Sequence, residues 1–255
     1  MNHLIIGANK TPILQYATSD FLLIADGPLI DQLTLPSRRK VTRFDVSKHH
    51  LNPLQEVDYR RAKEFVSVID AIFPEGENTL TKKNANFVLL NALLDEPTYL
   101  HKLLHPNKKD PAAQDAYQKI QTILLSPVLK SVLCKPTNFS LKGIVLARLD
   151  RAKLGDFDAL ALGMMLMSVY SGQIILPDGA FYLRDTHVRL IREGRLTVGV
   201  NHLSELSPKV RDAALLIEDK RGVQATYEDA LTLARHARLL PNTNEFNDFV
   251  QQAMA

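Results

Sequence analysis

The strongest constraint on the fold is a set of short apolar runs, each of strand length and nearly all ending in or followed by glycine or aspartate. Their residues are apolar at consecutive positions rather than at alternate ones, which is typical of strands buried on both faces of a parallel sheet. Helical stretches lie between the later runs, and this alternation predicts a doubly wound α/β sheet. The runs span 3–7, 21–26, 143–149, 172–178, 195–200 and 213–219.

Three helical stretches accompany the later runs. Residues 155–172 are apolar almost all round, as expected of a crossover helix packed on a sheet, and Asp156 is its predicted cap. The stretches 184–195 and 225–240 are amphipathic. Thr226 and Asp229 fit a capping box in which aspartate replaces the usual glutamate.

The middle of the chain has helical periodicity only, in 59–73, in 82–96 and onward to Leu133, with Pro106 and Pro111 as breakers that mark a loop. This contrast predicts an α/β core formed by 1–55 and 136–255. Residues 56–135 are expected to form an all-helical insertion between early and late strands.

Composition narrows the class of protein. With 255 residues, 45% hydrophobic and 23% charged, the chain is long enough for a large core and fits neither a disordered nor a fibrous protein. The net charge of +3 permits contact with nucleic acid without requiring it. No uncharged apolar stretch reaches the roughly 18 residues of a membrane span, and no export signal opens the chain, so we expect a cytoplasmic protein. The single cysteine, Cys134, excludes an internal disulfide and is expected to fill an apolar helix face.

The segment HLIIGANKTP raises the question of a phosphate-binding loop. A working loop reads G-x-x-x-x-G-K-[ST], so that its backbone N–H groups can wrap a phosphate. Here only two residues separate Gly7 from Lys10, the second glycine is missing, and Pro12 removes a further N–H after Thr11. Two interpretations remain open, a shortened nucleotide site and an ordinary turn from strand to helix.

Read in order, the motifs resemble the FtsK/HerA superfamily of DNA-pumping ATPases, particularly the conjugative coupling proteins. In 21–54, Asp26, Phe44-Asp45 and Asn52-Pro53-Leu54 stand where that family has a strand ending in aspartate, a strand ending F-D, and N-P-L. Residues 143–181 are similar to its strand with a small basic turn, its long apolar helix and its Walker B strand. Residues 195–206 are similar to its sensor strand, and 225–236 to a late helix.

The resemblance implies a RecA-like, mostly parallel sheet with helices on both faces, a tendency to form rings and an ancestral role in moving DNA. It also implies a nucleotide site, which departs from the family pattern in several places. Gly179 follows the Walker B aspartate where the family has the glutamate that polarises water, and Asn201 replaces the sensor glutamine. The nucleotide-site positions implied by the resemblance are Gly7, Lys10, Thr11, Asp26, Asp178 and Asn201. Asp26-Gly27 and Asp178-Gly179 equally fit tight turns after strands.

The sequence therefore favours a catalytically degenerate, pseudo-ATPase relative of these motors, with no catalytic residue assigned and no cofactor expected. Such a protein is expected to act as a scaffold or partner-binding subunit in a DNA-transfer, packaging or mobile-element machine. Its partners would be further copies of itself, an active motor or another component of the machine.

Two alternatives stay open. One is an active ATPase with an unconventional phosphate loop, using ATP and Mg²⁺ and a glutamate from elsewhere, with Glu193, Glu205 and Glu218 as candidates. The other is a nucleotide-independent DNA-binding protein that contacts phosphates through Arg148, Arg151 and Lys153. These cations could equally form surface ion pairs with Asp150, Asp156 and Asp158. His101 and His105 share helical spacing but have no third ligand nearby in sequence, so no metal site is expected.

Overall fold

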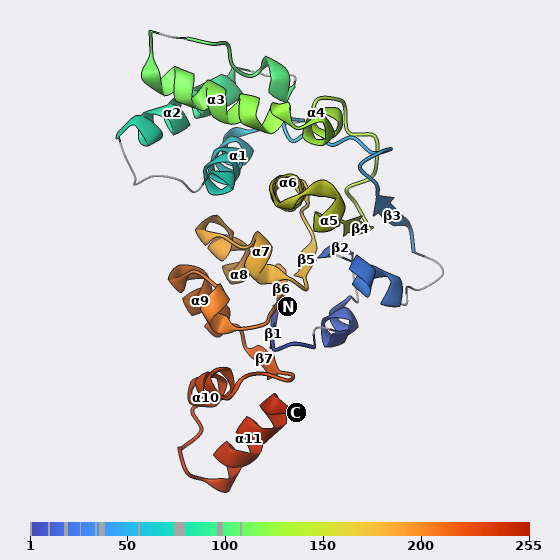
Figure 1. Cartoon of the computed structure of the whole chain (residues 1–255), viewed down its shortest axis with the longest axis vertical. Coiled ribbons are helices and arrows are strands. Elements are labelled where there is room, and N and C mark those ends of the chain that lie inside the picture. The colour runs from blue at the N-terminus through green and yellow to red at the C-terminus, as the bar shows by residue number, and fades with distance from the viewer. Residues whose placement is uncertain are drawn as a thin grey trace. The chain divides into compact units, whose positions relative to one another are not determined.

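The computed structural model describes residues 2–9, 11–17, 20–25, 27–33, 35, 39–55, 57–73, 80–95, 99–107 and 109–255 (Figure 1). The chain divides into two compact units. The first comprises Met1–Val41, Gly143–Leu146 and Gly172–Ala255, and the second comprises Thr42–Lys142 and Ala147–Ser171.

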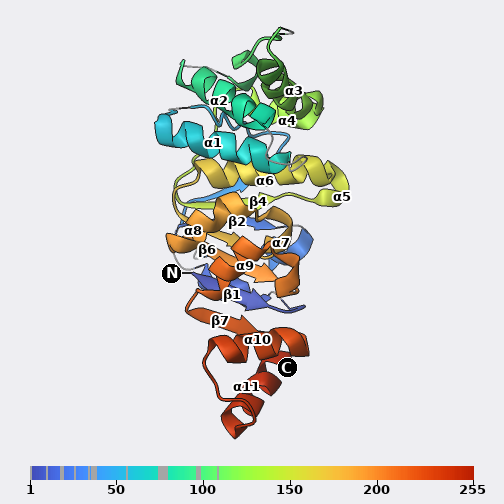
Figure 2. The ribbon, with the colours of Figure 1, turned by 90° about the vertical axis from the view of Figure 1, so that its left-hand side faces the viewer.

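A mostly parallel sheet organises the fold. Over the described residues it has seven strands in the order β3-β4-β2-β5-β6-β1-β7. β1 pairs in parallel with β6 and β7, and β5 pairs in parallel with β2 and β6. Figure 2 shows β2, β6, β1 and β7 in succession. The strands are β1 (His3–Ile6), β2 (Phe21–Ala25), β3 (Val41–Phe44), β4 (Ile144–Arg148), β5 (Gln173–Leu176), β6 (Leu196–Val200) and β7 (Asp219–Gly222).

In the first unit, helices cover both faces of the sheet, as expected from the sequence. The helices α7, α8 and α9 lie on one side of it, and the 3-10 helices η1 and η2 lie on the other (Figure 1). The core of this unit is built from strand residues that are fully buried, among them Ile5, Phe21, Leu23 and Ile175. Its helices are η1 (Thr11–Tyr16), η2 (Gly27–Gln32), α7 (Gly179–Tyr182), η4 (Asp185–His187), α8 (Val188–Arg192), η5 (Leu203–Glu205), α9 (Pro208–Leu215), α10 (Tyr227–His236) and α11 (Asn244–Met254).

The second unit is mainly helical. The predicted helices at 59–73 and 82–96 are confirmed as α1 and α2, and the remaining helices continue to Leu133 as expected. Within 56–135, every described residue in regular structure is helical. The helices of the unit are α1 (Tyr59–Ile72), α2 (Leu80–Leu94), η3 (Leu100–Lys102), α3 (Pro111–Leu125), α4 (Pro127–Leu133), α5 (Arg151–Leu154) and α6 (Asp156–Val169).

The loop that Pro106 and Pro111 were predicted to mark lies between η3 and α3. Pro111 ends this loop by opening α3, because a first-turn proline has no N–H to satisfy and Asp110 caps the turn by accepting from the amides of Ala112 and Ala113. One helix start differs from the sequence prediction. Asp156 is the first residue of α6 rather than its cap, and Gly155 takes the cap position with φ +80°. A carboxylate in the first turn still interacts favourably with the helix dipole.

The expected strand at 213–219 is wrong. Residues 213–215 form the last turn of α9, whose buried positions Val210, Ala213 and Ala214 follow helical spacing. The strand is β7, which starts at Asp219 and reads Asp-Lys-Arg-Gly. The edge strand β7 contains no apolar run. The prediction, which relied on apolar runs, therefore placed a strand at the apolar end of the neighbouring helix α9.

Candidate functional site

The residues predicted for a nucleotide site come together at one edge of the sheet in the first unit. β1 and β6 are parallel with Ile6 level with Val200, so Gly7 and Asn201 leave neighbouring strands at the same height. β5 is parallel to β6, and Asp178 follows its end. Because open α/β sheets bind ligands at the carboxyl ends of their strands, this edge is the candidate site. Lys10 and Asp26 were also predicted here, and both lie outside the described residues.

The turn after β1 packs tightly against the chain that follows β7. Gly7 has φ +130°, and a Cβ placed on it would lie 1.9 Å from the carbonyl oxygen of Val223. The Gly7 amide donates to the Val200 oxygen at 2.9 Å, and the Val223 amide donates to the Ile6 oxygen at 2.8 Å. Only glycine fits this position.

The segment after this turn is a 3-10 helix rather than an α-helix. β1 ends at Ile6 and η1 begins at Thr11, which leaves four positions between them. Thr11 is exposed, and its amide donates to the side-chain oxygen of Asn9 at 3.1 Å. A helix this short, with Pro12 in its first turn, lacks the aligned N–H groups that bind anions at the start of an α-helix.

A polar cluster fixes the far end of η1 to the sheet. The Tyr16 ring stacks on His3 with centroids 3.5 Å apart, and its hydroxyl donates to Asp219 at 3.3 Å. Burial, followed by the nearby Asp219 carboxylate, raises the pKa of Tyr16 above its usual value. Burial tends to raise the pKa of Asp219, but the His3 hydrogen bond and Arg221 outweigh it, so this pKa lies below its usual value. The cluster therefore holds the Tyr16 end of η1 against β1 and β7.

Packing explains why a glycine, Gly179, follows Asp178 at the position that the resemblance assigns to the Walker B motif. Asp178 is partly buried and immediately precedes α7, whose first residue is Gly179. A Cβ at Gly179 would lie 2.4 Å from Val198 Cγ1 and 3.1 Å from the Gly199 oxygen. The backbone at this point packs directly on β6, so no larger residue can be accommodated without movement.

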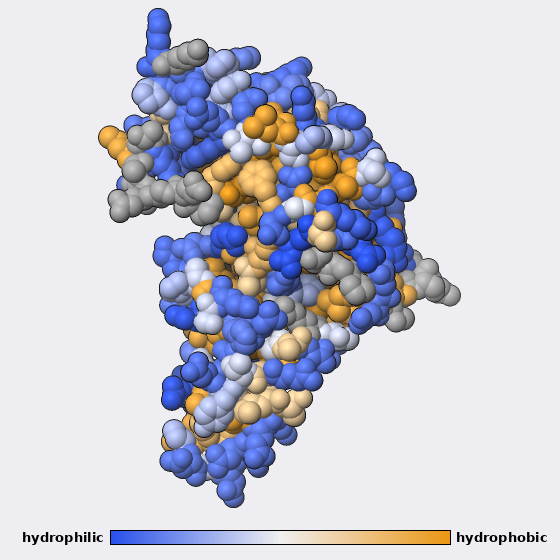
Figure 3. All heavy atoms as spheres, in the orientation of Figure 1, coloured by the Kyte–Doolittle hydropathy of each residue, from blue (hydrophilic) through white to orange (hydrophobic). Residues whose placement is uncertain are grey.

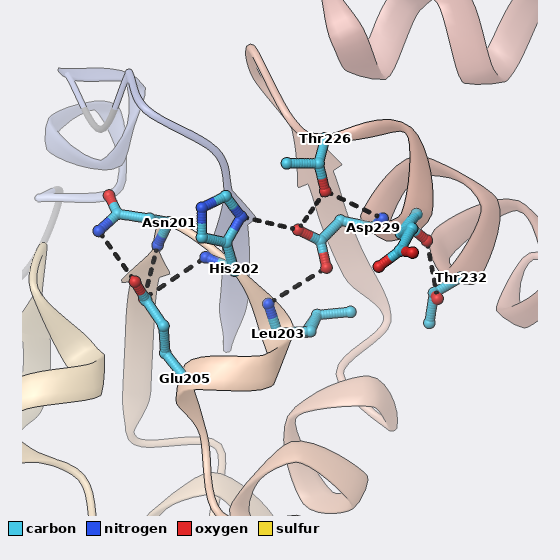
Figure 4. A network of polar contacts seen from close by, with 8 residues as sticks. Asn201, His202, Leu203, Glu205, Thr226, Asp229 and Thr232 are labelled. Atoms are coloured by element: carbon cyan, nitrogen blue, oxygen red, sulfur yellow. Dashed lines mark hydrogen bonds and ion pairs between the residues drawn. The ribbon is translucent and has the colours of Figure 1, made fainter.

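Asn201, at the sensor position, is held by a carboxylate. Its backbone amide donates to Glu205 Oε2 at 3.1 Å and its side-chain amide donates to Oε1 at 3.2 Å (Figure 4). The His202 amide donates to the same carboxylate at 3.4 Å. The Asn201 side chain is thus turned toward Glu205 within its own loop.

Of the three glutamates considered as replacements for the missing one, only Glu205 lies at this edge. Glu193 precedes β6 and pairs with Arg189 at 2.8 Å and Arg195 at 3.5 Å. Glu218 immediately precedes β7. Both are therefore near the amino ends of parallel strands, away from the carboxyl edge.

Asp229 contacts the loop after β6 beside the candidate site, and the sequence did not reveal this contact. Of the predicted capping box the first half is present, because the Asp229 amide donates to the Thr226 hydroxyl oxygen, which caps α10. Its buried carboxylate also accepts from the Thr226 hydroxyl at 2.8 Å, the Leu203 amide at 3.2 Å and His202 Nδ1 at 3.3 Å (Figure 4). Asp229 therefore joins α10 to the loop after β6. The one available signal was His202, two residues after the predicted strand 195–200.

The predicted nucleic-acid contacts belong to the second unit. Arg148 is exposed at the end of β4, and Lys153 is exposed on α5, where its Nζ lies 3.4 Å from Asp150 Oδ2. Arg151 is half-buried at the start of α5. Asp150 caps this short helix, so the cluster mixes cations with one carboxylate.

Neither a metal centre nor a membrane span is found over the described ranges. No three histidine, cysteine, aspartate or glutamate side chains there gather closely enough to hold a metal ion. No helix in the same part of the chain combines the length and apolar character that crossing a bilayer requires. Cys134 ends α4 half-buried, and burial raises its pKa, so the thiol is not activated as a nucleophile.

The seven-stranded, mostly parallel sheet with helices on both faces is a RecA-like fold, as the motif order predicted. Two solved structures share this fold. VirB4 of Thermoanaerobacter pseudethanolicus matches with a TM-score of 0.67 and 11% identity, covering 98% of this chain and 83% of that one. The bacterial conjugative coupling protein TrwBdeltaN70, in its unbound form, matches with a TM-score of 0.54 and 13% identity, covering 83% of this chain and 65% of that one. No protein-family profile matches the sequence, and no curated protein does.

Proposed function

We propose that this protein is a RecA-like component of a DNA-transfer machine that has lost ATP hydrolysis and works by binding partner proteins. Its likeness to VirB4 and to a conjugative coupling protein supports the link to DNA transfer. The main support for a loss of nucleotide binding is that amides of the shortened loop already donate hydrogen bonds to acceptors within the protein. Gly7 and Thr11, which bracket the shortened loop, both donate their N–H groups to acceptors within the protein.

A phosphate loop works because successive amides point into one concavity and have no other acceptor. Redirecting the Gly7 amide would break its bond to β6, and the Val223 carbonyl oxygen lies against the same turn. A carbonyl oxygen carries partial negative charge and repels a phosphate. Binding ATP at this edge would therefore require the turn to rebuild.

The other two elements of the site support the same conclusion. Gly179 is packed on β6, so the position next to Asp178 carries no carboxylate to polarise water. Asn201 donates to Glu205, which is the one candidate glutamate at this edge. Glu205 already accepts from the amides of Asn201 and His202, which stabilise it as a loop anchor rather than as a general base.

The experiment that tests this proposal is calorimetric titration with ATP and with ADP, each with and without Mg²⁺, at high protein concentration. We expect no binding heat for the wild type or for Lys10→Ala. Magnesium-dependent binding that weakens in Lys10→Ala would contradict the proposal and favour an active ATPase with an unconventional loop. ATP turnover that disappears in Asp178→Ala would do the same.

Binding to DNA without nucleotide is a second candidate function, favoured by the exposure of Arg148 and Lys153 within six residues of each other. Phosphate contacts of this kind make affinity fall steeply with salt. Gel shifts with the wild type and with Arg148→Ser/Lys153→Ser should show binding at low salt that the double substitution weakens. Equal binding by both proteins would show that Arg148 and Lys153 do not make the contact, and no binding at low salt would remove this candidate.

A further inference from the structure

A cavity of about 420 Å³ opens in the first unit at the amino ends of the strands. Asn2, Gly194 and Glu218 line it, and they lie just before β1, β6 and β7 in the chain. Because these strands are parallel, the cavity lies at the edge of the sheet opposite the candidate nucleotide site. A Cβ placed on Gly194 would meet nothing within 4 Å, so the cavity is open beside it. The volume is within the usual range of ligand-binding pockets.

The inner wall of the cavity is apolar. Ile191 on α8, Ala213 on α9 and Ile217 before β7 line it, and all three are buried. The polar groups of Asn2 are already bonded, since its side chain donates to the Ile191 oxygen and accepts from the Leu196 amide at 2.8 Å. The cavity therefore suits an apolar group rather than a polar one.

An exposed leucine forms part of the rim. Leu216 lines the cavity and is 76% exposed. Hydrophilic residues cover most of the surface seen in Figure 3, with apolar residues between them, so an exposed leucine is not unusual by itself. Leu216 differs because an apolar cavity continues beside it. Pockets for small molecules enclose most of the ligand, so a ligand that also covers this rim is better supplied by a protein chain.

The lining includes one cation whose charge is not matched. Arg192 is exposed at the end of α8, and its side chain makes no hydrogen bond or ion pair within the described part of the chain. The neighbouring cations are matched, because Arg189 and Arg195 both pair with Glu193, at 2.8 Å and 3.5 Å. Arg192 is therefore available to a carboxylate from another molecule.

The acidic residue of the lining has a cation of its own chain beside it. Burial lowers the pKa of Lys220, and the nearby carboxylates of Glu218 and Asp219 oppose this effect. The amine of Lys220 also donates to the Ile217 oxygen, which keeps it close to the cavity wall. The charge that the cavity offers to a partner is thus the positive charge of Arg192.

We propose that this cavity holds an apolar side chain of a partner protein, and that an aspartate or glutamate next to it in the partner's sequence pairs with Arg192. The inference rests on the proposed function, because it names the surface that a partner-binding protein would use. The apolar side chain would fill the space beside Ile191 and Ala213 and cover Leu216, which removes apolar surface from water. The exposed charge pair would add specificity more than affinity.

Methyl NMR on the full chain tests the proposal with a peptide probe, N-acetylated and C-terminally amidated Ser-Asp-Leu-Glu-Ser. We expect the methyl signals of Ile191, Ala213, Leu216 and Ile217 to shift as the peptide is added. Replacing the leucine of the peptide by alanine should weaken binding at least about tenfold, and replacing its acidic residues by Asn and Gln should weaken it about threefold. Shifts confined to other parts of the chain, or none up to the solubility limit of the peptide, would overturn the proposal.

Arg192→Gln and Arg235→Gln form a matched pair of variants. Both arginines are exposed at the ends of helices, and only Arg192 lines the cavity. Arg192→Gln should abolish the preference for the acidic peptide over its Asn and Gln counterpart, whereas Arg235→Gln should retain it. The same preference in both variants would show that Arg192 does not bind the carboxylate, which also overturns the proposal.

Failure of this inference is distinguishable from failure of the proposed function. Absent methyl shifts together with absent heat on ATP titration would remove only the partner site at the cavity. Magnesium-dependent ATP binding together with the expected methyl shifts would remove only the loss of nucleotide binding.

Discussion

Acid should destabilise this protein through one buried histidine. His187 in η4 is 4% exposed, its Nδ1 accepts from the Arg184 amide at 3.0 Å, and its Nε2 finds no hydrogen-bond partner among the described residues. Burial, and then the neighbouring Arg184 charge, lower the pKa of His187 to about 4 from its ordinary 6.5. The ring is therefore neutral in the folded protein.

The size and sign of the effect follow from linkage. His187 takes up a proton near pH 6.5 in the unfolded chain and only near pH 4 in the folded protein. The neutral ring therefore costs no stability above pH 6.5, and the folded state loses stability as the pH falls from 6.5 to 4. The full difference corresponds to about 3 kcal/mol, of which about 2 kcal/mol is lost between pH 7.5 and pH 5. The pKa values of Asp185 and Asp219 are lowered below 3.8, so these carboxyls contribute little in this range.

Urea unfolding followed by circular dichroism at pH 7.5 and pH 5 measures this loss. The comparison is with His187→Asn, whose side-chain oxygen can still accept from the Arg184 amide but cannot take up a proton. The asparagine side chain is smaller and lowers the absolute stability of the variant, so the quantity compared is the change in unfolding free energy between the two pH values. We expect this change to be about 2 kcal/mol larger in the wild type. Equal changes in the two proteins would refute the role assigned to His187.

Three further substitutions test the packing at the candidate site. Gly179→Glu should cost about 1 to 3 kcal/mol of unfolding free energy and give no ATP turnover, because its Cβ meets Val198; measurable turnover would contradict this. Gly7→Ala should cost at least about 2 kcal/mol in urea unfolding, since it combines φ +130° with a backbone collision, and a neutral effect would mean that the turn can open. Asp229→Ala should lose about 1 to 3 kcal/mol and speed hydrogen exchange in α10, because Leu203, Thr226 and His202 lose their acceptor; unchanged exchange would argue against the link to β6.

The sequence predicted the parallel sheet well because strands buried on both faces are apolar at consecutive positions, whichever strands they pair with. Residues 21–26 and 195–200 could be recognised as strands without any contact being known, and they form β2 and β6. β7 could not be recognised, because a charged edge strand owes its structure to pairing with β1 rather than to its own composition.

The candidate site could be located but not described from the sequence. Parallel strands bring Gly7, Asp178 and Asn201 to one edge whatever their side chains do, which is why their common location was predictable. The partners of their polar groups depend on contacts distant in sequence. Val223 lies against Gly7, and Asp229 binds the loop after β6, and neither contact leaves a periodic pattern.

The charges of β7 also affect how this protein can assemble without aggregating. β7 is the last strand of the sheet on its side, and unpaired sheet edges invite strands from other chains. Asp219, Lys220 and Arg221 make that edge a poor template, since an apolar strand added there would lie against charged side chains. The charges of β7 therefore disfavour the addition of a strand from another chain at this edge of the sheet.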